Sequence, residues 1–229
     1  MGTKVGYNIA TTGLIFATDP NSELSWDGTN LTNLIDSSET TTASGTVSFS
    51  TDGGGTFTFG VNGSNFNFGN SGSLWGLNDV TLMGWVKQPS TSNPHQTVIC
   101  TSSSYRYGLK LMSRYHGEVA AWIGDGGSNS YLLGSGVNID GDNKYHHIAC
   151  TRNAGTGKLE IWVDGSRENY ATTYTGTIND DGSTGYGFDY HSIGYYHVGN
   201  IGQVYGYNRV LIEDEIQQAY EREKERYGL

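Results

Sequence analysis

The chain has 229 residues and a formal net charge of -10, with 34 glycines and only 3 prolines. This acidic balance excludes nucleic acid as a partner and disfavours polyanionic ligands, because phosphate binding needs a basic surface. No segment approaches the roughly 18 apolar residues of a membrane span, and residues 1–19 lack the apolar run of a secretory signal. We therefore expect no membrane insertion and no signal peptide.

Short strands separated by tight turns are predicted along most of the chain. Residues 1–12 read as a polar N-terminal arm and residues 13–19 as a first strand. Residues 21–50 are rich in Thr, Ser and Asn, which predicts loops around short strands. The other predicted strands, each bounded by turn residues, lie at 31–35, 46–49, 55–60, 80–87, 97–102, 107–112, 118–124, 144–165 (a hairpin), 191–196 and 201–208.

The hairpin at 144–165 shows the clearest alternation of residue types. Successive side chains of a strand point to opposite faces, so Leu159, Ile161 and Val163 share one face. Glu160 and Trp162 share the other face. We expect the aliphatic face to be packed, and the Asp-Gly pair directly after this strand to form a tight turn.

Only the C-terminal segment departs from the β pattern. Residues 211–226 carry apolar side chains at helical spacing, with acidic residues early and basic residues late, as a helix dipole favours. The fold class is therefore predicted as all-β, an antiparallel sandwich with one C-terminal α-helix. No linker divides the chain, and we expect residues 13–229, including the helix, to form one domain.

Cys100 and Cys150 each lie inside a strand-like run. A buried free thiol behaves as a small hydrophobic group, and the chain lacks the cysteine-dense framework of disulfide scaffolds. Free thiols are the expectation, while a disulfide between the two depends on a geometry that the sequence does not give.

An ordered set of motifs carries a family resemblance. WVK near Trp85, YGLKL at Tyr107, KYHHIA at Lys144, LEIWVDG at Leu159 and IGQVYGYNR at Ile201 follow one another in this order. Together they resemble the laminin-G-like members of the concanavalin A-like lectin/glucanase superfamily. The resemblance covers residues 13–229 and implies a jelly roll of two antiparallel sheets, one of them usually concave.

Two end segments resemble a narrower group. GLIFATDP near the start and EIQQAYEREKERYGL at the end look like members found in virion proteins of tailed bacteriophages. This resemblance implies a capsid decoration, tail or fibre protein that is assembled in the host cytoplasm and located on the virion. Its partners would be other virion proteins or a second copy of the chain.

The resemblance also raises the question of calcium. Laminin-G-like domains often hold Ca²⁺ with loop aspartates, and oxygen ligands suit this ion. None of the loops here has the spacing of a defined calcium motif, and aspartates are common in turns for conformational reasons alone. The candidate metal ligands are Asp125, Asp140, Asp142, Asp180 and Asp181.

Catalysis is not expected. Glycoside hydrolysis needs two facing carboxylates, and the glucanase branch of the superfamily carries them in an E-x-D-x-x-E strand. Here Glu160 is followed on its own face by Trp162 and Asp164, which is a different order of different residues. His146 and His147 lie on opposite faces of one strand, so they cannot ligate one metal together.

Aromatic residues supply the candidate binding site. Trp85, Trp122 and Trp162 oppose the aliphatic faces of their strands, so with Glu160 they could line an outer sheet face on which sugars stack. Alternatively, residues 21–72 fold over the three rings as a second small core. The tyrosine-rich segment at 186–207 suits adaptable recognition of sugar or protein, and its candidates are Tyr186, Tyr190, Tyr195 and Tyr196.

The predicted function is a non-catalytic binding or structural module with a lectin-like surface for host cell-surface glycan or for particle contact. Many copies on a particle would give weak sites avidity. A purely structural virion component is the first alternative, and a glucan-cleaving hydrolase is the second.

Overall fold

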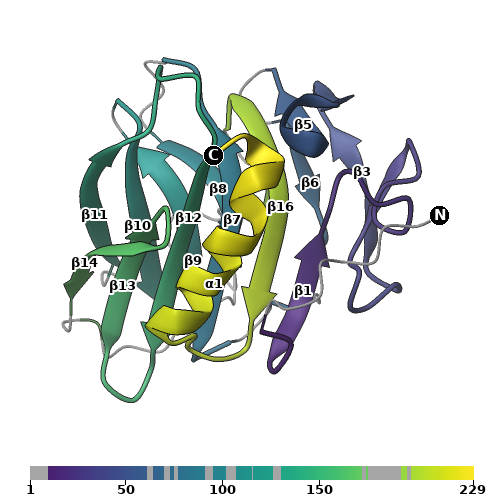
Figure 1. Ribbon diagram of the computed structural model, residues 1–229. Coiled ribbons are helices and arrows are strands. Elements are labelled where there is room, and N and C mark those ends of the chain that lie inside the picture. Colours follow the sequence, from purple (N-terminus) through teal and green to yellow (C-terminus); the bar gives the residue numbers. More distant parts are fainter. Residues whose placement is uncertain are drawn as a thin grey trace.

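The computed structural model describes residues 10–60, 64–69, 73–74, 77–90, 95–101, 107–114, 116–125, 130–171, 174, 192–194 and 197–229. Within these ranges two antiparallel β-sheets pack face to face, and one helix lies on the outside (Figure 1). The predicted all-β jelly-roll sandwich with a C-terminal helix is thereby confirmed.

The first sheet carries the helix on its outer face. Its described strands follow the order β14-β13-β12-β7-β16-β5-β4, with β1 also paired to β16. The bounds are β1 (Leu14–Thr18), β4 (Val47–Ser50), β5 (Thr56–Phe59), β7 (Val80–Lys87), β12 (His146–Asn153), β13 (Lys158–Val163), β14 (Ser166–Ala171) and β16 (Gly199–Tyr207).

The second sheet packs against the inner face of the first. Its described strands follow the order β11-β10-β9-β8-β15-β6-β3-β2. The bounds are β2 (Asn30–Thr32), β3 (Thr40–Ser44), β6 (Asn65–Asn67), β8 (His95–Cys100), β9 (Tyr107–Arg114), β10 (Glu118–Asp125), β11 (Ser130–Asn138) and β15 (Ser192–Ile193).

The main core lies between the two sheets. Leu159, Ile161 and Val163 of β13 belong to this cluster, as their alternation predicts, together with Leu111 of β9 and Ile123 of β10. The tight turn after β13 has the backbone that an Asp-Gly pair favours, with positive φ at both of its residues. The sequence pattern therefore assigned the packed face of this hairpin correctly.

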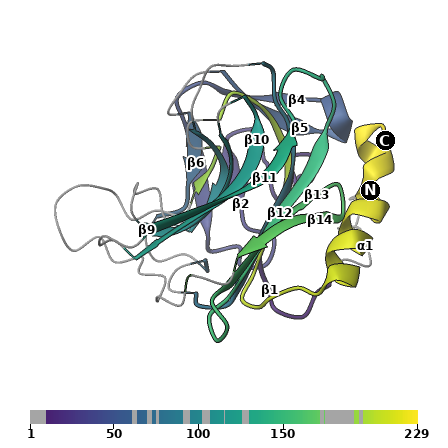
Figure 2. The ribbon, with the colours of Figure 1, turned by 90° about the vertical axis from the view of Figure 1, so that its left-hand side faces the viewer.

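The helix α1 (Glu213–Glu223) continues as a short 3-10 turn, η2 (Lys224–Tyr227), close to the predicted bounds. Three acidic residues occupy its first turn, where the helix dipole favours negative charge. Ile216 and Ala219 face the first sheet and pack on Met83, Ala149 and Trp162. Figure 2 shows α1 outside the sandwich, along the sheet that contains β12 and β13.

Both cysteines are free and buried, as expected. Burial raises the pKa of the Cys150 thiol, because a thiolate would be poorly solvated there. Among the described residues, no helix combines the length and apolarity needed to cross a membrane.

Candidate functional site

A polar groove opens on the outer face of the first sheet, beyond the end of η2. Thr58 of β5, Asn200 of β16 and Lys87 of β7 are direct cross-strand neighbours there. Because side chains alternate along a strand, their neighbours Phe57, Val86 and Ile201 point into the main core. The same three strands thus supply a buried apolar layer and a half-buried row of polar groups.

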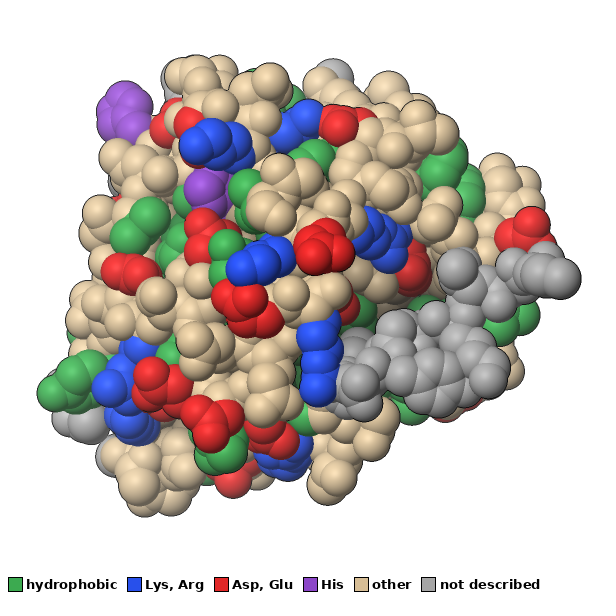
Figure 3. Space-filling model, viewed as in Figure 1, with side chains coloured by type: hydrophobic (Ala, Val, Ile, Leu, Met, Phe, Trp, Pro, Cys, Tyr) green, Lys and Arg blue, Asp and Glu red, His purple; other side chains and the backbone are tan. Residues whose placement is uncertain are grey.

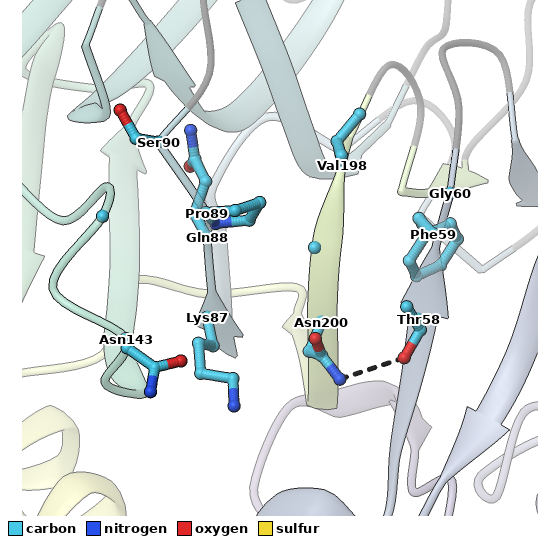
Figure 4. Close-up of a pocket in the computed structure, with 12 residues that line it drawn as sticks. Thr58, Phe59, Gly60, Lys87, Gln88, Pro89, Ser90, Asn143, Val198 and Asn200 are labelled. Carbon is cyan, nitrogen blue, oxygen red and sulfur yellow. Dashed lines mark hydrogen bonds between the residues drawn. The ribbon is translucent and has the colours of Figure 1, made fainter.

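Two connections complete the groove. Gln88, Pro89 and Ser90 follow β7 and form one wall, while Gly141 and Asn143 come from the loop between β11 and β12. The backbone nitrogen of Gly141 donates to the carbonyl of Gln88 at 3.0 Å, which joins the two connections. The cavity they enclose has a volume of about 660 Å³ (Figure 4).

A glycine sets how closely β16 approaches β7 at this point. Gly199 has φ +128°, and a Cβ there would lie 2.5 Å from the carbonyl oxygen of Lys87. Any larger residue would push the strands apart and change the width of the groove. Gly199, the first residue of β16, therefore sets the width of the groove, and the next residue, Asn200, lines it.

Hydrogen bonds fix the row of polar groups. The Nδ2 group of Asn200 donates to Thr58 Oγ1 and to Thr56 Oγ1, both at 3.1 Å. Both bonds use the amide nitrogen, so within the described part of the chain the amide oxygen keeps its capacity to accept. Figure 4 shows Asn200, Thr58, Lys87 and Asn143 at the same end of the groove.

Lys87 carries the positive charge of the groove. Its Nζ pairs with the carboxylate of Asp52 and lies 4.8 Å from the centre of the Tyr145 ring. The hydrogen bond from Lys87 is the main reason why the pKa of Asp52 lies below its usual value. This pairing holds the ammonium at one end of the groove, within reach of a ligand.

The tryptophans predicted to line one outer face do not form such a face. Trp122 lies in β10, which belongs to the second sheet, whereas Trp85 and Trp162 lie in the first. Trp85 and Trp162 are both buried, at 0% and 2% exposure. The C-terminal helix and η2 supply most of the cover, since Ile216 and Ala219 cluster with Trp162, and Tyr227 clusters with Trp85. Of residues 21–72, Leu34 also packs against the Trp162 cluster.

Trp85 is held by a buried network under the helix. Its ring stacks on Tyr227 at a centroid distance of 4.2 Å and an interplanar angle of 17°. Its Nε1 donates to Glu223 at 2.6 Å, and the Tyr205 hydroxyl donates to the other oxygen of that carboxylate at 2.6 Å. Burial raises the pKa of Glu223 to about 7, although both hydrogen bonds lower it.

Glu160 shares the outer face with Trp162, as predicted, but its carboxylate is already engaged. It lies 2.7 Å from Lys158 Nζ and 3.0 Å from Arg167 Nη1, and it accepts a 3.3 Å hydrogen bond from Thr151. These contacts describe an ion-pair cluster at the sheet surface. Its role as a ligand contact stays a prediction.

The remaining predicted site residues divide between described and undescribed parts of the chain. Tyr186, Tyr190, Tyr195, Tyr196, Asp180 and Asp181 lie outside the described residues. Asp125 ends β10, whereas Asp140 and Asp142 lie in the loop after β11, where Asp142 pairs with His146 at 3.0 Å. The described residues do not gather into a group of three that could hold a metal, so we derive no role for calcium.

The groove residues themselves were missed in the sequence. Alternation in TFTF places Thr58 on the face opposite Phe57 and Phe59, and this signal was available. The sequence carries no comparable signal for Asn200 and Lys87. These two residues reach Thr58 only through pairing between strands that are distant in the chain.

Acidic and basic side chains are interspersed on the face that carries α1 (Figure 3). No large area of one sign dominates this view of the described residues. Local charge at the groove therefore depends on a few named side chains rather than on a broad field.

Comparison with known proteins gives one family match. Residues 62–217 match a laminin-G model of the family described as the concanavalin A-like lectin/glucanases superfamily. No curated protein sequence matches the chain.

Several solved structures are similar in fold. Domain 4 of AbnA, an arabinanase from Geobacillus stearothermophilus solved with arabinotriose, has a TM-score of 0.65 and 19% identity, covering 90% of this chain and 97% of that one. The CBM40 of a Ruminococcus gnavus sialidase bound to α2,3-sialyllactose has a TM-score of 0.60 and 15% identity, covering 72% and 96%.

The binding domain of botulinum neurotoxin DC, in complex with SialylT, has a TM-score of 0.66 and 13% identity. The match covers 92% of this chain but only 52% of the toxin domain. At these identities the likenesses show the fold alone.

Proposed function

The chain belongs to the concanavalin A-like lectin/glucanases superfamily, and on that premise we propose that it is a non-catalytic carbohydrate-binding module. We assign the binding site to the polar groove formed by Thr58, Lys87, Asn143 and Asn200. Similar folds in structures solved with sialyllactose and arabinotriose support a glycan as the ligand class.

The chemistry of the groove lining carries this proposal. Amide, hydroxyl and ammonium groups line it, together with Phe59 and Pro89. Sugar hydroxyls both donate and accept hydrogen bonds, and amide side chains can do the same in return. A site of this size with a few fixed polar groups is typical of small-ligand recognition.

The same lining argues against hydrolysis. None of the described residues that line the groove is Asp or Glu, whereas glycosidases use a pair of carboxylates. Glu118 of β10, which lies outside the groove, is bound by Arg114 at 2.7 Å and by the Gly136 backbone nitrogen at 3.0 Å. A binding role therefore fits the groove better than a catalytic one.

A glycan array with the isolated protein, followed by titration calorimetry on the best ligand, tests this function. Asn143 has φ +61°, so Asn143→Gly removes the amide while the backbone stays unstrained. Loss of one or two hydrogen bonds should weaken binding about tenfold.

His116→Gly is the matched control, because His116 has φ +62° and lies outside the groove. It should leave the affinity unchanged. Absence of any glycan ligand would refute the proposed function, and equal affinity of the wild type and Asn143→Gly would move the site elsewhere.

We propose separately that this module is part of a phage virion. The resemblance of the segments around Leu14–Thr18 and after Glu213 supports it. These two segments also form one unit, since Arg226 contacts the carboxylate of Asp19 at 2.7 and 2.9 Å. The strand pairing of β1 with β16 likewise supports treating residues 13–229 as one domain.

Purification of assembled phage particles tests whether the protein is located on the virion. Stoichiometric recovery with capsid or tail proteins would support a virion location. If the protein is recovered with the particles but binds no glycan, the purely structural alternative is favoured. If the protein is absent from the particles, the virion proposal is refuted.

A further inference from the structure

A second pocket borders the groove on the side of the helix. It has a volume of about 380 Å³, and its walls include Tyr145, Tyr227 and Leu229. Lys87 and Asn143 line both the groove and this second pocket. The two cavities are therefore adjacent, with the Lys87 side chain between them.

Each cavity is large enough to be a ligand site in its own right. Small-molecule sites usually measure about 300–1,000 Å³, and both volumes fall in that range. A ligand confined to one cavity would leave the other to water. A ligand that extends past Lys87 would use both.

Hydrogen bonds through Thr56 connect residues that line the two cavities. Asn200 of the groove donates to Thr56 Oγ1 at 3.1 Å, and Thr56 lies 3.3 Å from the hydroxyl of Tyr145 in the second pocket. The Tyr145 ring in turn contacts Tyr227 at 5.1 Å between centroids. Lining side chains that are already fixed in this way lower the ordering cost of binding an extended ligand.

The second pocket differs from the groove in charge. Lys87, Lys144 and Arg226 line it, against the single acid Asp52, in a chain that has 13 basic and 23 acidic residues. Asp52 pairs with Lys87, and Asp19 pairs with Arg226. Within the described part of the chain, the Lys144 side chain makes no ion pair and is exposed. The nearby carboxylate of Asp142 interacts with its charge but is paired with His146.

We propose that the ligand is an oligosaccharide that crosses Lys87, with a neutral unit in the groove and a carboxylate-bearing unit beside Lys144 in the second pocket. This inference rests on the proposed carbohydrate-binding function and defines its ligand class. An exposed ammonium group that makes no ion pair can bind an anionic sugar by a charge-assisted hydrogen bond. A single carboxylate suits this local excess of positive charge, whereas a polyanion would meet the acidic surface around it.

Calorimetric titration with paired oligosaccharides tests the proposal. The pairs have equal length and differ only in a terminal uronic acid or hexose, and the lengths run from one unit to four. Affinity should rise until the ligand spans both cavities. The acidic member should bind roughly fivefold more tightly at low salt, a modest preference because the contact is exposed, and added salt should reduce it.

Two variants separate this inference from the function on which it rests. Lys144→Gln should abolish the preference for the acidic member and leave binding of the neutral member intact. Arg222→Gln removes the same charge from an exposed position outside both pockets and should retain the preference. Asn200→Ala, a groove variant, should weaken both members alike.

Equal affinity for acidic and neutral members, or affinity that does not increase beyond one unit, would overturn the extended-ligand inference while the groove function stands. A wild-type protein that binds no member of the series would overturn both. Retention of the preference in Lys144→Gln would also refute the assignment of the carboxylate to this pocket.

Discussion

The buried carboxyl of Glu223 predicts that the C-terminal helix is attached more weakly at high pH. Burial raises its pKa from an ordinary 4.5 to about 7. An acid with a raised folded-state pKa stabilises the fold below its unfolded pKa and loses that contribution as the pH rises through the folded pKa. The relevant window therefore runs from about pH 4.5 to about pH 7.

Glu223→Gln is the perturbation that isolates this effect. The shift corresponds to about 3 kcal/mol over the full window, of which about 2.5 kcal/mol falls between pH 5 and pH 8. The unfolding free energy of the wild type minus that of the variant should decrease by this amount over that interval. For a chain of this length the decrease equals about 5 °C in Tm.

Urea denaturation followed by tryptophan fluorescence measures the difference, because Trp85 stacks under the helix and contacts Glu223. Other titrating groups occur in both proteins and cancel. Among them is His146, where burial lowers the pKa but pairing with Asp164 and Asp142 outweighs it, so that the net pKa is raised. A difference that stays constant or grows with pH would refute the reasoning.

Three further predictions concern other buried groups. Burial lowers the pKa of His147 to about 4 and of His197 to about 3. Each neutral imidazole therefore contributes stability above its unfolded pKa near 6.5, and this contribution is lost as the pH falls. Urea denaturation should show the unfolding free energy decreasing as the pH drops from about 6.5 to 4. His147→Gln should reduce that fall, and an unchanged pH profile would contradict the assignment. Trp162→Ala should lower the unfolding free energy by about 3–5 kcal/mol because it empties the layer under α1, whereas a loss of glycan affinity without loss of stability would show that its ring meets the ligand. Cys100 and Cys150 should resist a thiol reagent in the native protein and react only in denaturant, since both are fully buried, and rapid native labelling of either would refute their placement.

The strands and the helix could be predicted from local patterns in the sequence. Alternation in β13 identified Ile161 as a core residue, and the acidic first turn identified the helix, because these features depend on neighbours within a few residues. The resemblance of ordered motifs then supplied the sandwich architecture, which the family match confirms.

The residues of the candidate site could not be predicted from such local patterns. Trp85 and Trp162 have the alternation of exposed residues, but a helix more than fifty residues away in the chain covers them. The groove depends on β16 lying between β5 and β7, which brings Asn200 beside Thr58 and Lys87. Such register is a property of tertiary pairing, and no short stretch of sequence encodes it.

Gly228 and Leu229 form part of the wall of the second pocket. Any residues joined after Leu229, whether a natural continuation or a purification tag, must leave the fold beside the proposed site of the carboxylate-bearing unit. A bulky C-terminal fusion should therefore hinder long oligosaccharides more than short ones, and a tag for binding studies is better placed at the N-terminal end. The same proximity makes this end of the chain a suitable position for a fluorophore that reports occupancy of the pocket.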